Sequence, residues 1–113
     1  MTRHRLSDMT GGWFVGAFEP VVLRSEMYEV ACKHYLAGDR EPRHVHRIAT
    51  ELTLIVRGRV TMNGEEFGSG DIVTLAPGEA VEFIVLEDAT TVVVKTPSVL
   101  GDKYLVGHDS PTA

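Results

Sequence analysis

The sequence predicts a single all-β domain, and three observations lead to that prediction. Short apolar segments recur along the chain with turn residues between them, which is typical of antiparallel strands. Asn63-Gly64 lies between two such segments and favours a tight hairpin, because both residues tolerate positive φ. No segment has the 3.6-residue periodicity of a helix that packs on a core. Many short strands predict a closed or two-layered antiparallel structure.

We expect strands over residues 21–23, 28–36, 44–46, 51–56, 60–62, 65–67, 71–75, 80–86 and 91–96. The turns between them are marked by Gly38-Asp39, Asn63-Gly64, Gly68-Ser69-Gly70 and Pro77-Gly78. Several strands are apolar on both faces, as in the run Val92-Val93-Val94. One face of such a sheet would line the interior, and a second sheet, the N-terminal arm or a partner subunit would cover the other. Strand exchange with that partner would give a homodimer.

Length and composition bound the class of protein. The chain has 113 residues, which predicts one domain, with an N-terminal arm at 1–19, the barrel at 20–106 and a tail at 107–113. The net charge of −5 argues against binding to nucleic acid or to an anionic membrane surface. Cys32 is the only cysteine, so an intrachain disulfide and a thiolate zinc site are excluded. Without an apolar signal segment or membrane span, we expect a cytoplasmic protein.

Three strong metal ligands fall within eight residues. His44 and His46 are two apart on a predicted strand, so their imidazoles point to the same face. Residues 47–50 can turn the chain, and Glu51 then begins the next strand. Two imidazoles and one carboxylate form an arrangement that holds a divalent metal and leaves coordination positions open. Without a metal, three inward polar groups would need other partners, because unpaired buried charges are costly.

Other side chains are candidates for binding a ligand. The segment 40–59 holds five arginines, Arg57 among them, against two glutamates, so it is either a rim that attracts a carboxylate or phosphate or a set of solvated charges. Lys95 lies in an apolar strand, where it either extends to the rim or pairs with an anion inside. His34 either reaches the cavity or lies on the surface. Tyr35, on the opposite strand face, would line the cavity or pack in the core.

The spacing Gly38-x5-His44-x-His46-x4-Glu51-x6-Gly58 resembles the first conserved motif of the cupin superfamily at every specified position. The second cupin motif is half present. Gly70-Asp71 opens it and Pro77-Gly78 closes its turn, but Val81 stands in place of the motif's histidine and Val85 in place of its asparagine. The resemblance spans residues 28–98 and implies a small single-domain jelly roll, also called a double-stranded β-helix barrel.

The resemblance also implies a cofactor. Metal-binding cupins use two histidines and a glutamate from the first motif and a histidine from the second. Here His44, His46 and Glu51 would hold a divalent ion (iron, nickel, manganese or zinc), and the fourth protein ligand is missing. Three protein ligands and water still make a viable site.

Two classes of function agree with these features. The first is a metal-binding cupin with a small-molecule site inside the barrel. As an enzyme it would be an iron-dependent dioxygenase, or an isomerase or lyase with zinc, manganese or nickel. The second is a metal-free, non-catalytic module that binds or senses a sugar or carboxylate. A weaker third is a metal-free epimerase or isomerase, with His44 or Glu51 as base and Tyr35 as acid. The segment Asp102-Lys103-Tyr104 gives no functional signal and is expected to pack along the barrel.

Overall fold

Two strands, β5 and β8, organise the whole fold of this protein. The structure, a computed structural model, describes residues 1–107. The elements are η1 (Leu6–Asp8), η2 (Thr10–Gly12), β1 (Trp13–Gly16), β2 (Leu23–Arg24), β3 (Glu29–Tyr35), β4 (Arg40–Val45), β5 (Thr50–Met62), β6 (Glu65–Gly68), β7 (Ile72–Leu75), β8 (Ala80–Thr96) and β9 (Tyr104–Leu105). β5 and β8 pair with each other along most of their length.

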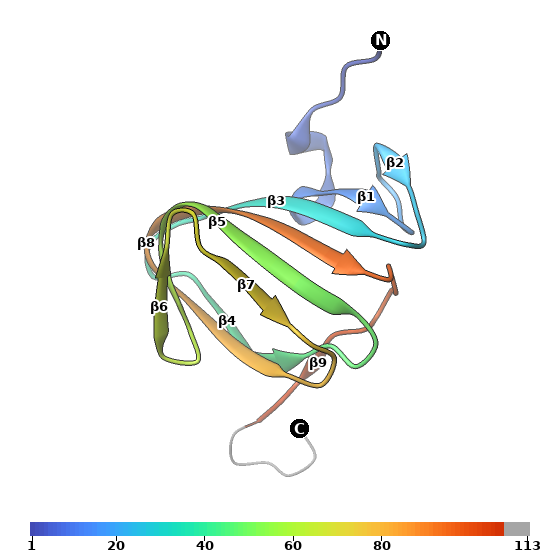
Figure 1. The fold of residues 1–113 in the computed structure, drawn as a ribbon. Coiled ribbons are helices and arrows are strands. Elements are labelled where there is room, and N and C mark those ends of the chain that lie inside the picture. The colour runs from blue at the N-terminus through green and yellow to red at the C-terminus, as the bar shows by residue number, and fades with distance from the viewer. Residues whose placement is uncertain (108–113) are drawn as a thin grey trace.

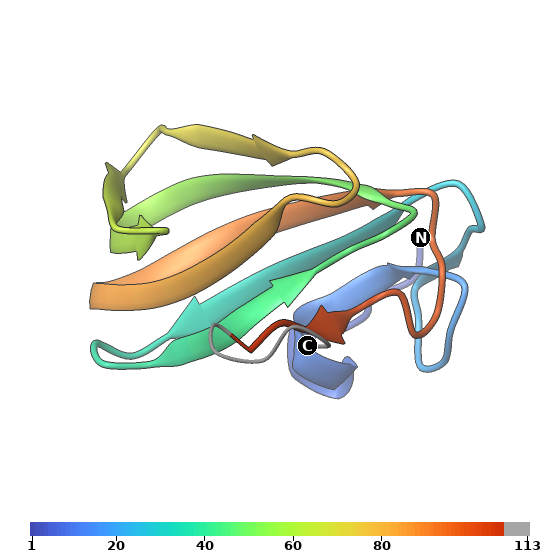
Figure 2. The same ribbon diagram turned by 90° about the horizontal axis from the view of Figure 1, so that it is seen from below.

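The long strands bend, so each contributes to two layers. The second half of β8 pairs with β3 and with the first half of β5, which also pairs with β7. The first half of β8 pairs with β4 and with the second half of β5, which also pairs with β6. In Figure 1, β8 turns near its label, so that its two halves lie beside different neighbours. Figure 2 shows the resulting layers, with β7 and β5 on one side and β4 and β9 on the other. The predicted all-β, double-stranded β-helix is confirmed in its two-layered form.

Gly58 makes the bend in β5 possible. Its φ is +90°, and a Cβ there would lie 2.3 Å from the carbonyl oxygen of Asp88 and 2.6 Å from Cα of Ala89. The register of β5 against β8 shifts several times between Ile55 and Val60, as expected where bulges bend a strand. Glycine alone tolerates both this conformation and this close approach.

The bend explains one error in the predicted strands. The strands predicted from the sequence separated 51–56 from 60–62 and 80–86 from 91–96. The structure joins each pair into one strand, since bulges let the pairing continue through the corner. The predicted hairpin at Asn63-Gly64 is present, with positive φ at both residues.

The N-terminal segment extends a sheet at its edge. β1 pairs antiparallel with β3, and β2 pairs parallel with β1. The segment therefore adds strands beside β3, whereas covering a sheet face was one of the roles considered for it from the sequence. In Figure 1 the first residues project away from the sheets. Among the described residues, no helix is long and apolar enough to cross a membrane. Of the predicted tail at 107–113, residues 108–113 lie outside the described part of the chain.

The apolar core fills the space between the bent halves of β5 and β8. It consists of Ile55, Val60, Met62, Val81, Phe83, Val85 and Ala89. These side chains are nearly inaccessible to solvent. Burying a side chain as large as valine, isoleucine, methionine or phenylalanine stabilises a fold by about 1.5–3 kcal/mol. Met62, Val81 and Phe83 also line the cavity, so the core forms the cavity's inner wall.

Candidate metal centre and ligand cavity

His44 and His46 enter the site at the end of β4. Both side chains are buried, with 4% and 5% of their surface exposed. The Nδ1 of His44 donates to the carbonyl oxygen of Pro42 at 2.9 Å, which leaves its Nε2 lone pair available. Such a hydrogen bond on the far nitrogen is the usual way to fix the tautomer and orientation of a metal-ligating histidine.

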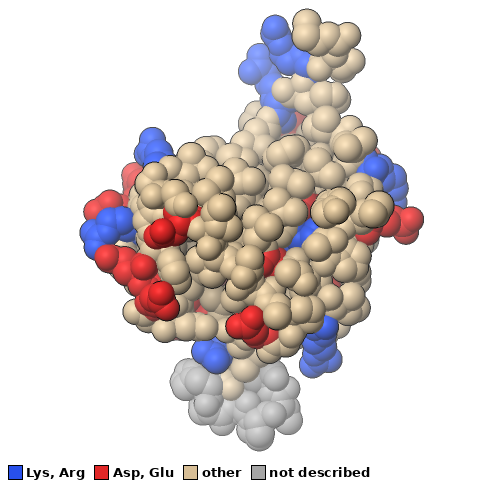
Figure 3. Space-filling model, in the orientation of Figure 1, with Lys and Arg blue, Asp and Glu red and all other residues tan. Residues whose placement is uncertain are grey.

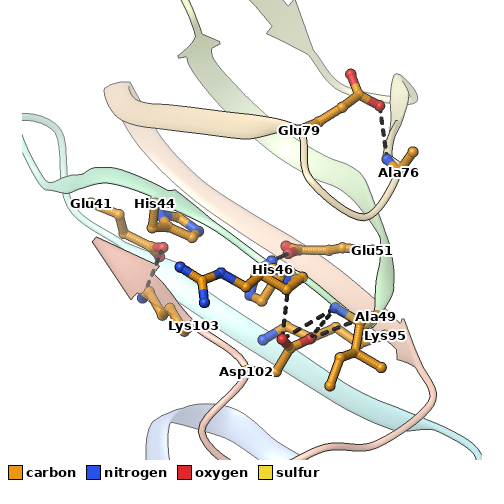
Figure 4. A network of polar contacts seen from close by, with 12 residues as sticks. Glu41, His44, His46, Ala49, Glu51, Ala76, Glu79, Lys95, Asp102 and Lys103 are labelled. Atoms are coloured by element: carbon orange, nitrogen blue, oxygen red, sulfur yellow. Dashed lines mark hydrogen bonds and ion pairs between the residues drawn. The ribbon is translucent and has the colours of Figure 1, made fainter. Parts of the chain in front are cut away.

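Glu51 reaches the two imidazoles from the other layer, at the start of β5. One possible ligand atom each from His44, His46 and Glu51 lies within 4.8 Å of the others. The Nδ1 of His46 is 3.2 Å from Oε2 of Glu51 (Figure 4). The Nε2 of His46 and the Oε2 of Glu51 are buried and accept or donate no hydrogen bond within the described residues. Buried polar atoms without partners are costly, so these atoms fit a bound cation.

The local environment favours the unprotonated imidazoles that a metal requires. Burial lowers the pKa of His46 to about 4, with Lys95 acting in the same direction. Burial also lowers the pKa of His44, although its bond to Pro42 opposes the shift. For Glu51, burial raises the pKa, and the charge of Lys95 partly offsets that effect. A metal ion bound at this site would hold Glu51 as carboxylate.

The loop between the ligands is held by a buried aspartate. The carboxylate of Asp102 accepts backbone N–H bonds from Arg47 at 3.0 Å, Ile48 at 3.1 Å and Ala49 at 2.9 Å (Figure 4). Burial raises the pKa of Asp102, but the N–H groups of Ala49, Arg47 and Ile48 outweigh burial and keep the pKa below its usual value. Asp102 therefore fixes the turn that brings Glu51 to the two histidines, although no functional signal for it was found in the sequence.

Val81 occupies the position from which a fourth ligand would come. It lies directly opposite His44 in the register of β4 and β8, and it lines the cavity. The turn before it keeps a structural role, because the N–H of Gly78 donates to the carbonyl of His46 at 2.7 Å. The second motif thus supports the backbone of the site and supplies no side chain to the candidate metal centre.

A cavity of about 350 Å³ opens beside the candidate metal ligands. Tyr35 and Glu41 lie on its wall, and the Tyr35 hydroxyl donates to Oε2 of Glu41 at 2.7 Å. Burial and the charge of Glu41 raise the pKa of Tyr35 well above its usual value, so the phenol is protonated at neutral pH. Burial raises the pKa of Glu41, but the bond from Tyr35 and the charges of Lys33 and Lys103 together outweigh burial and keep the pKa below its usual value. Lys103 approaches Glu41 at 3.7 Å (Figure 4).

Lys95 also lies inside the cavity, as the sequence suggested for a lysine in an apolar strand. Its Nζ is 3.6 Å from Oε1 of Glu29. The other oxygen of Glu29 accepts from the Ser98 hydroxyl at 2.7 Å. Lys95 therefore has an internal anion as its partner. Neither Glu29 nor Ser98 was among the residues predicted from sequence.

Two predicted ligand-binding residues lie outside the cavity. His34 is exposed, and its ring hydrogen-bonds to the hydroxyl of Thr90 at 3.0 Å. It follows Lys33 on β3, so strand alternation turns it outward while Lys33 and Tyr35 turn inward. Arg57 is exposed at the corner of β5 and does not line the cavity. The other arginines of the predicted rim, Arg40, Arg43, Arg47 and Arg59, are exposed as well and absent from its lining.

Known proteins share the fold of this chain at low sequence identity. No protein-family model and no curated protein matches the sequence. A conserved protein with a double-stranded β-helix domain from Klebsiella pneumoniae gives a TM-score of 0.66 at 22% identity, covering 73% of this chain and 72% of its own. The nickel(II) complex of the Escherichia coli pirin YhhW gives a TM-score of 0.62 at 19% identity, covering 77% of this chain and 39% of its own. Oxalate decarboxylase from Bacillus subtilis, described with Mn(II) centres, gives a TM-score of 0.61 at 19% identity, covering 73% of this chain and 25% of its own. These likenesses establish the fold.

Proposed function

We propose, from the premise that this chain has the fold of the cupin superfamily, that it is a metal-binding cupin which binds a small molecule in its cavity. His44, His46 and Glu51 would hold the divalent ion, with Nε2 of His44 free and directed by the bond to Pro42. The observation that carries the proposal is the convergence of one possible ligand atom from each of the three side chains within 4.8 Å, with Nε2 of His46 buried and without a hydrogen-bond partner. A cation bound there would satisfy these groups.

The donor set narrows the kind of ion. Two imidazoles and a carboxylate suit iron, nickel, manganese and zinc better than magnesium or calcium, which prefer oxygen ligands. The nickel and manganese described for proteins of similar fold support this choice. With Val81 in place of a fourth side chain, several coordination positions would be left for water and ligand. A divalent ion there would polarise a carbonyl or hydroxyl oxygen of the ligand.

The chain's own residues supply the groups for proton transfer in a reaction of the isomerase or lyase class. Tyr35 is held as a protonated phenol and points its hydroxyl at Glu41, inside the cavity. The bond from Tyr35 and the charges of Lys33 and Lys103 keep Glu41 ionised, and its lowered pKa makes this carboxylate a weak base. Tyr35 is therefore the candidate proton donor, and Glu41 orients its hydroxyl. An iron-dependent oxygenase would need the same metal ligands but no such donor.

The second candidate is a metal-free module that binds or senses a small molecule. The raised pKa of Glu51 favours it, because a protonated Glu51 can remain in a buried site without a cation. In that case His46 and Glu51 would hydrogen-bond a sugar or carboxylate directly. The same raised pKa would also suit Glu51 as a general base.

Metal content separates the two candidates. We expect protein purified without chelator, or supplied with manganese or nickel, to bind the ion in near-stoichiometric amount. His44→Ala and His46→Ala should reduce the bound ion to well below the stoichiometric amount, because each removes a neutral nitrogen ligand and so weakens the affinity. His34→Ala is the matched control, since His34 is exposed and bonded to Thr90. A wild-type protein that binds neither ion, or equal binding in all three variants, would exclude the metal site and favour the binding module.

We also propose a homodimer, because the outer face of the β3–β8–β5–β7 sheet is apolar. Val92, Val94, Leu52 and Leu54 alternate with the cavity-lining residues and point outward, and Ile72 beside them is 63% exposed. In Figure 3 most Lys and Arg side chains on the face shown lie at its margins. Light scattering should give a dimer, and Ile72→Glu should give a monomer; a monomeric wild-type chain would exclude the proposal. A cytoplasmic location stays a prediction.

A further inference from the structure

The lysines and arginines of this protein are completely segregated. The chain has three lysines, Lys33, Lys95 and Lys103. All three line the same cavity, beside the candidate metal ligands. The eight arginines are exposed, and none of them lines it. Ammonium groups that converge in a partly buried space repel one another, so the arrangement calls for anions between them.

The internal carboxylates are already engaged. Glu29 pairs with Lys95 and accepts from Ser98, and Glu41 pairs with Lys103 and accepts from Tyr35. Asp102 is occupied by three backbone N–H groups. Glu51 would coordinate the metal ion. Lys33 has no carboxylate within ion-pair distance among residues 1–107.

Lys33 instead lies against an aromatic ring that it shares with Lys95. The Nζ of Lys33 is 5.1 Å from the centroid of Trp13, and the Nζ of Lys95 is 4.8 Å from the same centroid. Cation–π contacts of this kind hold both ammonium groups in place while leaving their N–H donors free. Lys33 also acts electrostatically on Glu51, as Lys95 does, so both cations are near the metal centre.

The net charge of the cavity depends on the metal. Three lysines face four internal carboxylates, Glu29, Glu41, Glu51 and Asp102. A fifth carboxylate of the lining, Glu19, is exposed and pairs with Arg24, so it is already neutralised. A divalent ion changes this balance from one negative to one positive charge, which matches a monoanion. A phosphate dianion would exceed that charge, and lysines without arginine lack the planar fork that phosphate recognition often uses.

We propose that the ligand is a small monocarboxylic acid that also carries a hydroxyl or carbonyl group. Its carboxylate is held by Lys33 and Lys95 over Trp13, and its second oxygen faces the open positions of the metal. The placement of that second oxygen rests on the proposed metal function, whereas the lysine contact with the carboxylate does not. Lys33 and Lys95 are thus specificity-determining residues, and they select for charge.

Calorimetric titration of the nickel-loaded protein with glycolate tests the proposal, with uncharged glycolamide and inorganic phosphate as competing probes. We expect glycolate to bind, glycolamide to bind at least about tenfold more weakly, and Lys33→Gln to weaken glycolate binding by at least about tenfold. Arg57→Gln removes the same charge outside the cavity and should leave binding unchanged. Lys95→Gln is a second test of the same contact. Because this variant leaves Glu29 without its partner, thermal unfolding is used to establish that the variant is folded.

The outcomes separate this proposal from the metal site. Equal binding of glycolate and glycolamide, tighter binding of phosphate, or full glycolate binding in folded Lys33→Gln would each overturn the carboxylate ligand. Protein that holds stoichiometric nickel but no glycolate would overturn it as well, and would leave the metal site standing. Glycolate binding that depends on Lys33 in protein unable to hold nickel would support the lysine contact and exclude the metal.

Discussion

Asp102 offers a direct way to perturb the site without touching a metal ligand. Its carboxylate is 5% exposed and accepts three backbone N–H bonds from the loop that joins His46 to Glu51. Asp102→Asn keeps the size of the side chain. It replaces one acceptor oxygen by an NH₂ group, which then faces the N–H donors.

The expected loss follows from the burial of those donors. A hydrogen bond to a charged group contributes about 1.5–3 kcal/mol, and a buried donor left unpaired costs about as much. Ala49 is buried, so its N–H cannot turn to water, whereas Arg47 and Ile48 are exposed and can. We therefore count one full bond and a fraction of the others, and expect Asp102→Asn to lower the free energy of unfolding by about 2–3 kcal/mol.

Urea unfolding of the metal-free protein, followed by the fluorescence of Trp13, measures this loss. The control is Asp71→Asn, because Asp71 is exposed and accepts a single bond from the N–H of Gly68. We expect that variant to lose less than about 1 kcal/mol. Nickel affinity should fall about tenfold or more in Asp102→Asn, as for other groups that orient metal ligands. Equal midpoints and equal slopes for the two variants would refute the role of Asp102.

Three further changes follow from the same geometry. Burial puts the pKa of His46 at about 4. The free energy of unfolding of the metal-free protein should therefore fall by up to about 3 kcal/mol as the pH falls from 6.5 to 4, and His46→Gln should lack that part of the loss. Parallel pH profiles of unfolding for the wild type and the variant would contradict this. Val81→His places an imidazole opposite His44 and should tighten nickel binding about tenfold or more, measured by chelator competition; unchanged affinity would mean that position 81 does not face the metal. Gly58→Ala should destabilise the fold by about 3 kcal/mol or more, because its φ of +90° and the carbonyl of Asp88 leave no room for Cβ; a thermal midpoint equal to wild type would contradict the proposed corner.

The sequence was sufficient for the fold and for the metal-ligand cluster. Strand alternation places His44 and His46 on one face, and the turn that follows brings Glu51 to them, so local rules predict the cluster. The pairing of β4 with β8 could not be read from local patterns. It is what sets Val81 opposite His44.

Residues from distant segments were missed for the same reason. Asp102 and Lys103 come from the stretch after β8, and only the folded chain brings them beneath the loop and beside Glu41. Lys33 could have been found, since it shares its strand face with Tyr35, for which lining the cavity was one of the two interpretations. The same alternation argues against His34 as a cavity residue.

The central claim is that the imidazoles of His44 and His46 and the carboxylate of Glu51 share one divalent ion. X-ray absorption of the nickel-loaded protein tests it most directly, because imidazole rings give a characteristic multiple-scattering signal. We expect two imidazoles per nickel in the wild type and one in His44→Ala when the ion is supplied in excess. A wild-type spectrum with oxygen ligands only, or one that His44→Ala leaves unchanged, would contradict the claim.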